Sequence, residues 1–273
     1  MSLISKEIEG HYQQVLESER LSEGVGELER VRTQAILARY LPPAPAVIYD
    51  VGGAAGVYAF PLAEQGYQVH LIDPVELHLE QAWSRASESG IELASIARGD
   101  ARRLDVPDQS ADAVLFLGPL YHLVEHTERL QALREAHRIL KPGGVLFAAA
   151  VCRFASLIDG LSRGFFADPV FRSLVAEDLA SGQHRNPTNH PAYFTTAYFH
   201  RPEELASEAR DASFHDVEVL AVEGPAWSAA RFGESWDDDA QQKQLLEFLS
   251  LIEREPSMLG ASAHLIAVAH RAD

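Results

Sequence analysis

Cysteine is almost absent from this sequence. The 273 residues include a single cysteine, Cys152, so no disulfide can form within the chain, and a reducing compartment fits this composition. Cys152 ends an apolar run, which favours a small buried residue at the end of a strand over a catalytic thiol. The sequence therefore excludes a disulfide-stabilised scaffold and favours a cytoplasmic protein.

Positive charge is also scarce. The chain has 23 Lys and Arg residues against 40 Asp and Glu residues, a formal net charge of −17. A negative field of this size repels phosphate backbones and anionic lipid. Neither nucleic acid nor a membrane surface is therefore expected as a partner.

Long hydrophobic runs are missing too. The best one, residues 145–151, is far shorter than a membrane-spanning helix requires. The first residues, MSLISKEIEGHYQQ, lack the apolar core of a signal peptide. We therefore expect a soluble chain that is not exported.

Strand-like and helix-like segments alternate through the first half of the chain. Strands are predicted near 46–51, 67–72, 92–97, 112–117 and 144–151, and helices near 55–65, 75–88 and 127–140. This alternation predicts an α/β fold with a doubly wound, mostly parallel sheet. The length suits a single domain over 1–273, with N-terminal helices in 1–40 and a cofactor-binding core in 46–151.

Two insertions interrupt the later rhythm. Residues 153–200 carry many aromatics and the turn-rich stretch GQHRNPTNHP, and residues 224–258 contain Trp227 and Trp236. Long segments of this kind are usually binding loops. We expect the first insertion and the N-terminal helices to form a lid over an acceptor, with His190 and Tyr193 as substrate-binding residues. A helix over 202–212 and strands at 217–222 and 265–269 complete the pattern.

The sharpest motif is VIYDVGGAAG, residues 47–56, in which a buried strand meets a glycine-rich turn. Gly52 and Gly53 let the backbone approach a ligand closely, and Gly56 lets the next helix pack against the strand. Asp73 ends the following strand 21 residues after Gly52, the spacing at which a carboxylate reaches ribose hydroxyls. The pair predicts an adenosine-type cofactor, and both NAD and S-adenosylmethionine fit it.

Further motifs distinguish these two cofactors. They are Asp50 before the glycines, Gly99-Asp100-Ala101 after the third strand, Asp112-Ala113-Val114 opening the fourth, and Leu140-Lys141-Pro142-Gly143-Gly144 leading into the fifth. In this order they resemble the motifs of class I S-adenosylmethionine-dependent methyltransferases, which have a Rossmann-like fold. The resemblance covers residues 46–151 well, the last helix–strand units loosely and the insertions hardly at all.

The resemblance implies S-adenosylmethionine as cofactor and S-adenosylhomocysteine as product. By it, Asp50 positions the ammonium end, Gly52, Gly53 and Gly56 belong to the turn beneath the methionine moiety, and Asp73 with its neighbour Pro74 meets the ribose. Asp100 and the backbone of Ala101 would meet the adenine, and Leu117 would offer backbone near the methionine amino group. One departure is Ala54, where the family commonly has glycine; alanine is tolerated there if its φ is negative.

The acceptor side is predicted from Gly118-Pro119-Leu120-Tyr121-His122-Leu123, which follows the fourth strand. His122 is the candidate general base, since histidine titrates near neutral pH, and Tyr121 is a wall or hydrogen-bonding partner. A structural histidine capping the next helix is the alternative for His122.

Other polar residues carry weaker predictions. Tyr12 and Arg32 could meet the cofactor carboxylate, although surface ion pairs explain the arginine equally well. The spacing of His184, His190 and His200 matches no standard metal pattern, so we expect no metal and interpret these residues as solvated loop histidines.

Together these patterns predict methyl transfer to a small-molecule acceptor by in-line displacement, in a monomer or homodimer. The alternatives are an NAD-dependent oxidoreductase on the same fold and a non-catalytic S-adenosylmethionine-binding module.

Overall fold

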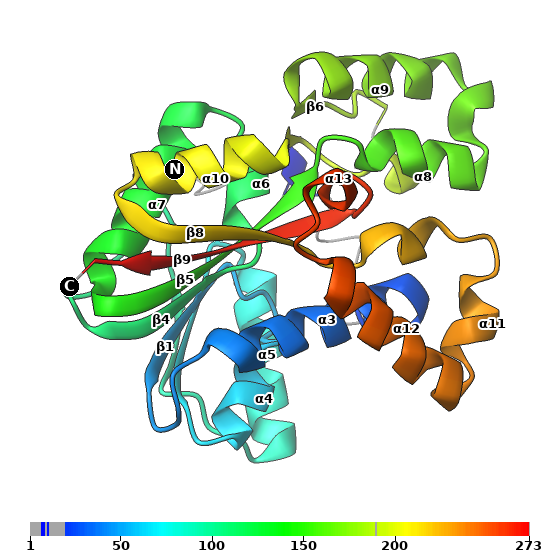
Figure 1. The fold of residues 1–273 in the computed structure, drawn as a ribbon. Coiled ribbons are helices and arrows are strands. Elements are labelled where there is room, and N and C mark those ends of the chain that lie inside the picture. Colours follow the sequence, from blue (N-terminus) through cyan, green and yellow to red (C-terminus); the bar gives the residue numbers. More distant parts are fainter. Residues whose placement is uncertain (1–6, 9, 11–19, 189, 273) are drawn as a thin grey trace.

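The predicted alternation of strands and helices is present in the computed structural model, which describes residues 7, 8, 10, 20–188 and 190–272 (Figure 1). The elements up to residue 152 are α3 (Gly24–Tyr40), β1 (Val47–Val51), α4 (Ala59–Glu64), β2 (Gln68–Asp73), α5 (Glu76–Ser89), β3 (Ser95–Arg98), β4 (Ala111–Phe116), α6 (Pro119–His122), α7 (His126–Ile139) and β5 (Leu140–Cys152). The core therefore folds where the sequence predicted it.

The sheet is mostly parallel, as predicted. Strands β3, β2, β1, β4 and β5 lie side by side in that order and run parallel to one another. After α10 (Pro202–Asp211), β8 (Phe214–Ala221) pairs with β9 (His264–Arg271), and β9 runs antiparallel to β5. The architecture is the Rossmann-like fold of the class I methyltransferases.

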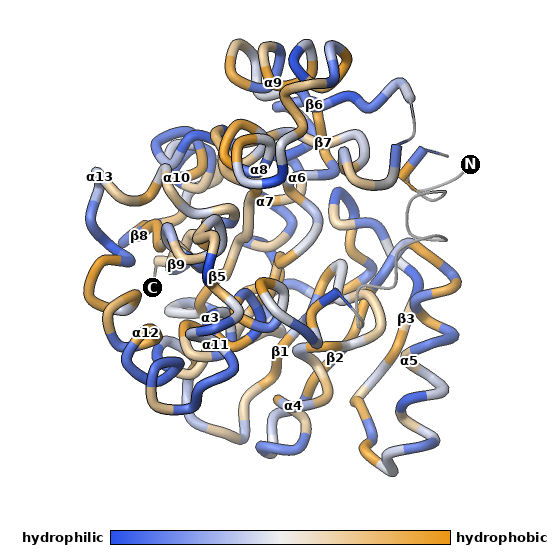
Figure 2. The backbone as a smooth tube through the Cα atoms, turned by 90° about the vertical axis from the view of Figure 1, so that its right-hand side faces the viewer, coloured by the Kyte–Doolittle hydropathy of each residue, from blue (hydrophilic) through white to orange (hydrophobic). Residues whose placement is uncertain are grey.

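Helices cover both faces of this sheet. One hydrophobic core joins strand residues to Leu133 of α7 and Leu205 of α10, and the other joins them to Ile36 of α3, Phe60 of α4 and Leu79 of α5. Figure 1 shows these two helix layers on opposite sides of the strands. In Figure 2, α5 alternates between hydrophobic and hydrophilic residues, as expected of a helix with one buried face.

The first insertion is more regular than its sequence suggested. It folds into α8 (Ala155–Arg163), the 3₁₀ turn η1 (Phe165–Ala167), α9 (Pro169–Ser181), β6 (Gln183–His184), the 3₁₀ turn η2 (Pro191–Tyr193) and β7 (Ala197–His200). Strand β7 pairs with the end of β5, and α8 and α9 stand above the sheet (Figure 2).

The aromatic residues of this insertion bury one another. The ring centroids of Phe165 and Phe171 lie 5.2 Å apart, and those of Phe171 and Tyr193 lie 4.9 Å apart. With Leu174 and Val175 they form a separate small core. Packing within the insertion therefore buries these aromatics.

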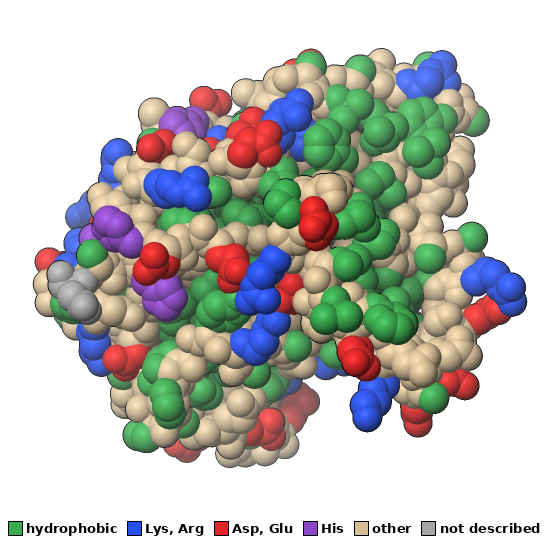
Figure 3. Space-filling view, viewed as in Figure 1, with side chains coloured by type: hydrophobic (Ala, Val, Ile, Leu, Met, Phe, Trp, Pro, Cys, Tyr) green, Lys and Arg blue, Asp and Glu red, His purple; other side chains and the backbone are tan. Residues whose placement is uncertain are grey.

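The second insertion packs against α3. It contains η3 (Gly224–Ser228), α11 (Phe232–Trp236), α12 (Asp239–Ile252) and α13 (Pro256–Leu259). Phe232, Trp236 and Leu249 share a cluster with Leu28 of α3, so residues more than 200 positions apart form one unit. Figure 3 shows hydrophobic side chains gathered over α8 and α9 and again toward α12, with an indentation of the outline between them.

None of the described helices is long and apolar enough to span a lipid bilayer.

Candidate active site

A cavity of about 520 Å³ opens where β1, β2, β3 and β4 end. Its wall includes the loops that follow these strands, together with residues of α3 and α6. In a doubly wound sheet this is the edge at which ligands bind. The volume lies within the range of small-molecule and cofactor sites.

The glycine-rich turn brings bare backbone to the cavity wall. Gly52 has φ of 73°, and a Cβ built on it would lie 2.9 Å from Cδ of Pro119. A Cβ on Gly53 would lie 2.6 Å from the carboxyl group of Asp50. A side chain at either position would therefore collide with its neighbours, which explains the two glycines.

Ala54 does not have the negative φ at which alanine would be tolerated in this turn. Its φ is +47°, in the left-handed region that disfavours alanine. The backbone N–H of Ala54 donates to Oδ2 of Asp73 at 2.9 Å. This hydrogen bond offsets part of the strain and ties the turn to the end of β2.

Gly56 does not line the cavity. Its φ is 78°, and a Cβ on it would lie 2.7 Å from the ring of Phe60 and 3.2 Å from Leu71. The predicted packing role is therefore present, whereas its place among the cofactor contacts is corrected: the glycine faces the core behind the turn.

Asp50 is a buried carboxylate with no partner. Its side chain is fully buried in the cavity wall, and neither oxygen has a hydrogen-bond partner among the residues that the structure describes. Burial, together with the negative charge of Asp73, raises the pKa of Asp50 to about 7. An unpaired buried carboxylate at a cavity wall suits a cationic group of a ligand.

Asp73 is held in a fixed orientation at the tip of β2. Its Oδ1 accepts hydrogen bonds from the N–H of Val75 at 2.9 Å and lies 3.0 Å from Nδ1 of His78. Helix α5 starts at Glu76, and Asp73 lies before its N-cap residue, Val75. Asp73 thus organises the turn, and it also lines the cavity together with Pro74.

Asp100, Ala101 and Leu117 also line the cavity, as predicted from the motifs. The carboxylate of Asp100 is clamped by Arg102, whose Nε and Nη2 donate to it at 3.0 and 2.7 Å. Sequence reasoning missed Arg102, although its position two residues after Asp100 was a usable signal. A ligand amino group at Asp100 would share this carboxylate with Arg102.

Tyr121 and His122 lie on α6 and both line the cavity. The hydroxyl of Tyr121 donates to the carbonyl oxygen of Leu117 at 3.3 Å, so α6 is tied to the end of β4. The N-cap of α7 is Glu125, which gives His122 no capping role there. The ring of His122 stacks on Phe194 of the first insertion with centroids 6.1 Å apart.

Three predicted site residues do not line this cavity, although one of them, Tyr193, lines a second, smaller cavity. Arg32 is buried and donates to the carbonyl of Val222 at 3.0 Å and to Glu253, so it is a structural ion pair away from the cavity and its predicted contact is corrected. His190 is exposed and stacks on Tyr193 at 4.3 Å, outside the cavity wall. The hydroxyl of Tyr193 donates to Asp168 at 2.7 Å.

The prediction for Tyr12 lies outside the described residues. His184 and His200 are buried rather than solvated. His184 faces Asp178 at 3.0 Å, and Nε2 of His200 lies 3.3 Å from Glu208.

Sequence reasoning missed a cluster of charges in the cavity wall. Arg20 pairs with Glu29 at 2.5 Å, and Nδ1 of His264 lies 2.6 Å from Glu223 and 3.6 Å from Glu29. Burial lowers the pKa of His264, but the charges of Glu29 and Glu223 outweigh it and raise the pKa to about 9. His264 is therefore protonated near neutral pH. No local signal could reveal this cluster, because its members are up to 244 positions apart.

These residues also have ligand atoms near enough for a metal. One atom each from Glu29, Glu223 and His264 lies within 4.8 Å of the others. A histidine must lose its proton to bind a metal, and the raised pKa of His264 opposes that loss. The arrangement fits an internal ion cluster.

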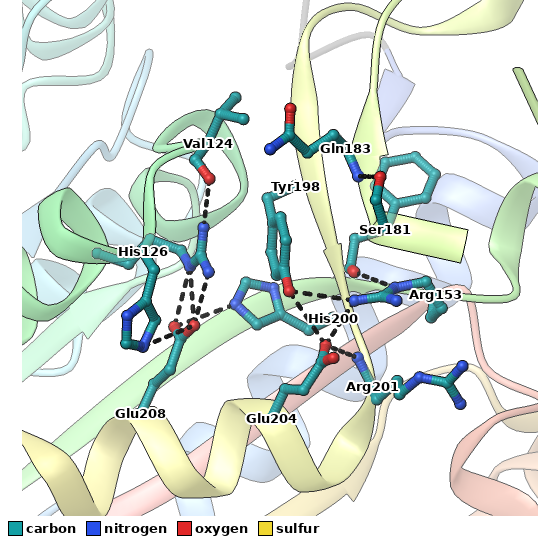
Figure 4. Close-up of polar contacts among 12 residues, drawn as sticks. Val124, His126, Arg153, Ser181, Gln183, Tyr198, His200, Arg201, Glu204 and Glu208 are labelled. Atoms are coloured by element: carbon teal, nitrogen blue, oxygen red, sulfur yellow. Dashed lines mark hydrogen bonds and ion pairs between the residues drawn. The ribbon is translucent and has the colours of Figure 1, made fainter. Parts of the chain in front are cut away.

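A second polar network surrounds Glu208 of α10, and Figure 4 labels Val124, His126, Tyr198 and His200 near it. Arg129 donates from Nη1 to the carbonyl oxygens of Leu123 and Val124, at 3.0 and 2.7 Å, and both of these residues line the cavity. The same guanidinium binds Glu208 of α10 at 2.7 Å. Its carbon lies 3.6 Å from the ring centroid of Tyr198 in β7. Arg129 thus connects the α6–α7 turn to α10 and to the first insertion.

Comparison with known proteins shows which family has this fold. Residues 49–148 match the family described as "Methyltransferase domain". The demethylmenaquinone methyltransferase of Deinococcus radiodurans is 31% identical over 189 residues, which cover 68% of this chain and 75% of that protein. The chain belongs to the class I S-adenosylmethionine-dependent methyltransferases. Other curated relatives match over less of their length: the chain spans 41% of the ubiquinone biosynthesis O-methyltransferase of Caulobacter vibrioides, at 28% identity over 39% of its own residues.

Solved methyltransferase structures share the fold. A possible histamine N-methyltransferase from Thermotoga maritima superposes with a TM-score of 0.57 at 19% identity, covering 96% of this chain and 99% of that one. Phosphoethanolamine N-methyltransferase 2 from Haemonchus contortus, in complex with S-adenosyl-L-methionine, gives 0.59 at 17% identity, covering 97% and 57%. At these identities the likeness establishes the fold.

Proposed function

We propose that this methyltransferase transfers a methyl group from S-adenosylmethionine to a small-molecule acceptor. The observation that carries the proposal is Asp50, a fully buried carboxylate without a partner among the described residues, in the wall of a cavity at the carboxyl ends of the strands. A protein leaves such a group unpaired only at a cost, and a cationic ligand group removes that cost.

The other predicted cofactor residues suit the rest of the same molecule. Asp50 is assigned the ammonium of the methionine moiety, and Asp73, held rigidly at the tip of β2, is assigned the ribose hydroxyls. Gly52 lets the methionine moiety of the cofactor approach the backbone closely. Asp100 and Ala101 are assigned the adenine. The order of these groups along the strand ends follows the order of the cofactor's own groups.

When bound, the cofactor supplies a methyl group on a positively charged sulfur. The carbon–sulfur bond breaks as the acceptor–carbon bond forms, and the electron pair of the broken bond stays on sulfur. The residues of the chain hold the acceptor in line with that bond, which is the main source of rate enhancement in such a displacement. A hydroxyl or amine acceptor also releases a proton, which we assign to His122, with Tyr121 as the neighbouring wall.

The nature of the acceptor rests on two observations. Curated relatives are named for steps of ubiquinone and menaquinone biosynthesis, which supports a small-molecule acceptor. The net charge of −17 disfavours nucleic acid.

The test is turnover with unidentified acceptors. The protein is incubated with S-adenosylmethionine and fractionated small-metabolite extracts, and release of S-adenosylhomocysteine and of methylated products is measured by mass spectrometry. We expect release from at least one fraction by the wild type and none by Asp50→Ala. Tight cofactor binding without release from any fraction would indicate a binding module instead.

A further inference from the structure

A second cavity of about 210 Å³ adjoins the first. Both cavities share Arg20, Tyr121 and His264 as wall residues, so they meet at this point. Tyr121 is in turn bound to the carbonyl of Leu117, at the end of β4. A molecule in the second cavity therefore has its inner end at the part of the first cavity where the acceptor atom is expected.

The walls of the second cavity are dominated by aromatic rings. They are Tyr121, Phe171, Tyr193, Phe194, Phe199 and Trp227. Aromatic side chains favour stacked or edge-on contact with a further ring. An apolar cavity of roughly 150 Å³ is large enough to hold benzene, so this one has room for a substituted ring.

The charged side chains of this wall are already neutralised. Arg20, His264 and Asp159 have oppositely charged neighbours in the pairs Arg20–Glu29, His264–Glu223 and Asp159–Arg163. His184, the fourth titratable wall residue, lies 3.0 Å from Asp178. A charged ligand would find no uncompensated charge to meet it, and its burial would be costly. The wall therefore favours a neutral occupant.

One polar atom in the wall has no partner. Ser156 of α8 is 8% exposed, and its hydroxyl has no hydrogen-bond partner among the described residues. Buried hydroxyls are normally hydrogen-bonded, so a group of a ligand is the partner that this site lacks.

Backbone strain points to the same place. Phe194 has φ of 61° and ψ of −171°, a combination that is almost confined to glycine. Its ring centroid lies 6.1 Å from that of His122 and 6.4 Å from that of Phe199, so the strained residue carries the ring between the two cavities. Strain of this kind clusters at ligand sites, where a side chain must be held in one place.

We propose that the second cavity is the acceptor subsite and that it binds a neutral, planar aromatic ring bearing a hydrogen-bonding substituent, as in the phenol class. That the bound ring is the methyl acceptor rests on the proposed function. The binding of the ring itself follows from the cavity alone, which allows the two to be tested separately.

The probe is 2-naphthol, and the matched ligand is decahydro-2-naphthol, which has the same skeleton and hydroxyl but no aromatic plane. Binding of each is measured by calorimetry with S-adenosylhomocysteine present and absent. We expect 2-naphthol to bind at least tenfold more tightly than its saturated counterpart.

Two substitutions on α8 form a matched pair. Ser156→Phe fills the cavity and is expected to weaken 2-naphthol binding at least tenfold, with S-adenosylhomocysteine affinity unchanged. Ser162→Phe places the same ring on the exposed side of the helix and should leave both affinities unchanged. Ser156→Ala, which removes only the hydroxyl, should weaken 2-naphthol by about twofold to tenfold.

Phe194→Gly keeps the test valid if Ser156→Phe does not fold. Glycine adopts the observed backbone angles without strain, so melting temperature should change little while 2-naphthol affinity falls. Equal affinities for the two ring systems, or undiminished 2-naphthol binding by folded Ser156→Phe or Phe194→Gly, would overturn the proposal. If 2-naphthol behaves as expected but S-adenosylhomocysteine does not bind, the ring site stands and the proposed function fails.

Discussion

The burial of Asp50 costs stability in the free protein. In the free protein, burial raises the pKa of Asp50 from 3.8 to about 7. At a pH between these two values, Asp50 is therefore ionised in the unfolded chain and protonated in the folded chain. Stability therefore falls as pH rises from about 4 to 7 and is lowest above 7. Asparagine resembles the protonated acid at every pH.

Asp50→Asn should therefore raise the free energy of unfolding at pH 8 by about 2–4 kcal/mol and leave it unchanged near pH 3. The same variant should bind S-adenosylhomocysteine more weakly. Denaturant unfolding at the two pH values and calorimetry measure these effects. Asp211→Asn, at an exposed carboxylate of α10, is the control and should change neither. A stability gain at both pH values would show that Asp50 is not the titrating group.

Asp73 is predicted to read the ribose. Asp73→Ala removes charge-assisted hydrogen bonds and should weaken S-adenosylhomocysteine binding by about tenfold to a hundredfold, measured by calorimetry. Glu76→Ala removes an exposed carboxylate three residues later in the first turn of α5 and should leave the affinity unchanged. An affinity that survives Asp73→Ala would mean that this carboxylate only organises the turn after β2.

The sequence predicted acidic residues at strand ends, and the structure shows that they line one cavity. Asp50 lies near the end of β1, Asp73 ends β2 and Asp100 follows β3, and parallel strands bring their carboxyl ends to one edge of the sheet. The sequence did not predict features that depend on tertiary contacts. Arg32 turns to Glu253, over 200 positions away, and Ala54 accepts a left-handed backbone because Asp73 holds its N–H.

Among the elements, α6 and α7 depend on Arg129 most directly. The guanidinium is buried, and it holds both Glu208 and the carbonyls of the turn between the two helices. Burial raises the pKa of Glu208, but His200 and Arg129 outweigh it and lower the pKa to about 2.

Arg129→Met should lower the free energy of unfolding by about 3–5 kcal/mol, because it leaves the buried Glu208 charge without its main partner. Arg134→Met, on the exposed side of α7, is the matched control and should cost less than about 0.5 kcal/mol. Denaturant unfolding measures both. Equal, small losses would show that Glu208 is compensated by His200 and His126 alone.

The first insertion is expected to exchange hydrogen at two rates. Amides of α9 should be protected in the free protein, because Phe171, Leu174 and Val175 are packed in a core of their own. Amides of residues 185–188 and 190–196, a segment that contributes wall residues to both cavities, should slow only when S-adenosylhomocysteine and an aromatic ligand are bound. Mass spectrometry of exchange after both additions measures the difference. Exchange in 185–196 that ignores both ligands would remove this segment from the site.

The sequence underestimated this insertion for a physical reason. GQHRNPTNHP indicates turns, but β6 and β7 form because β7 extends the end of β5, and no local pattern encodes that pairing. Helix α9, in contrast, does carry a readable pattern, since Phe171, Leu174, Val175 and Asp178 repeat at helical spacing and are buried.

For the whole molecule, the alternation of strands and helices was enough to predict the doubly wound sheet. That alternation did not predict the contact between α3 and the second insertion or the charge cluster of Glu29, Glu223 and His264. Both depend on contacts between residues about 200 positions or more apart in the sequence.

Cofactor titration tests most directly whether the cavity at the strand ends is built for S-adenosylmethionine. Calorimetry of the wild-type protein with S-adenosylhomocysteine and with NAD compares two adenosine cofactors that the glycine-rich turn and Asp73 do not distinguish. Asp50, unpaired and buried, favours the one with an ammonium group. We expect S-adenosylhomocysteine to bind with micromolar affinity and NAD to show no binding; NAD binding as tight as that of S-adenosylhomocysteine, or tighter, would contradict the account.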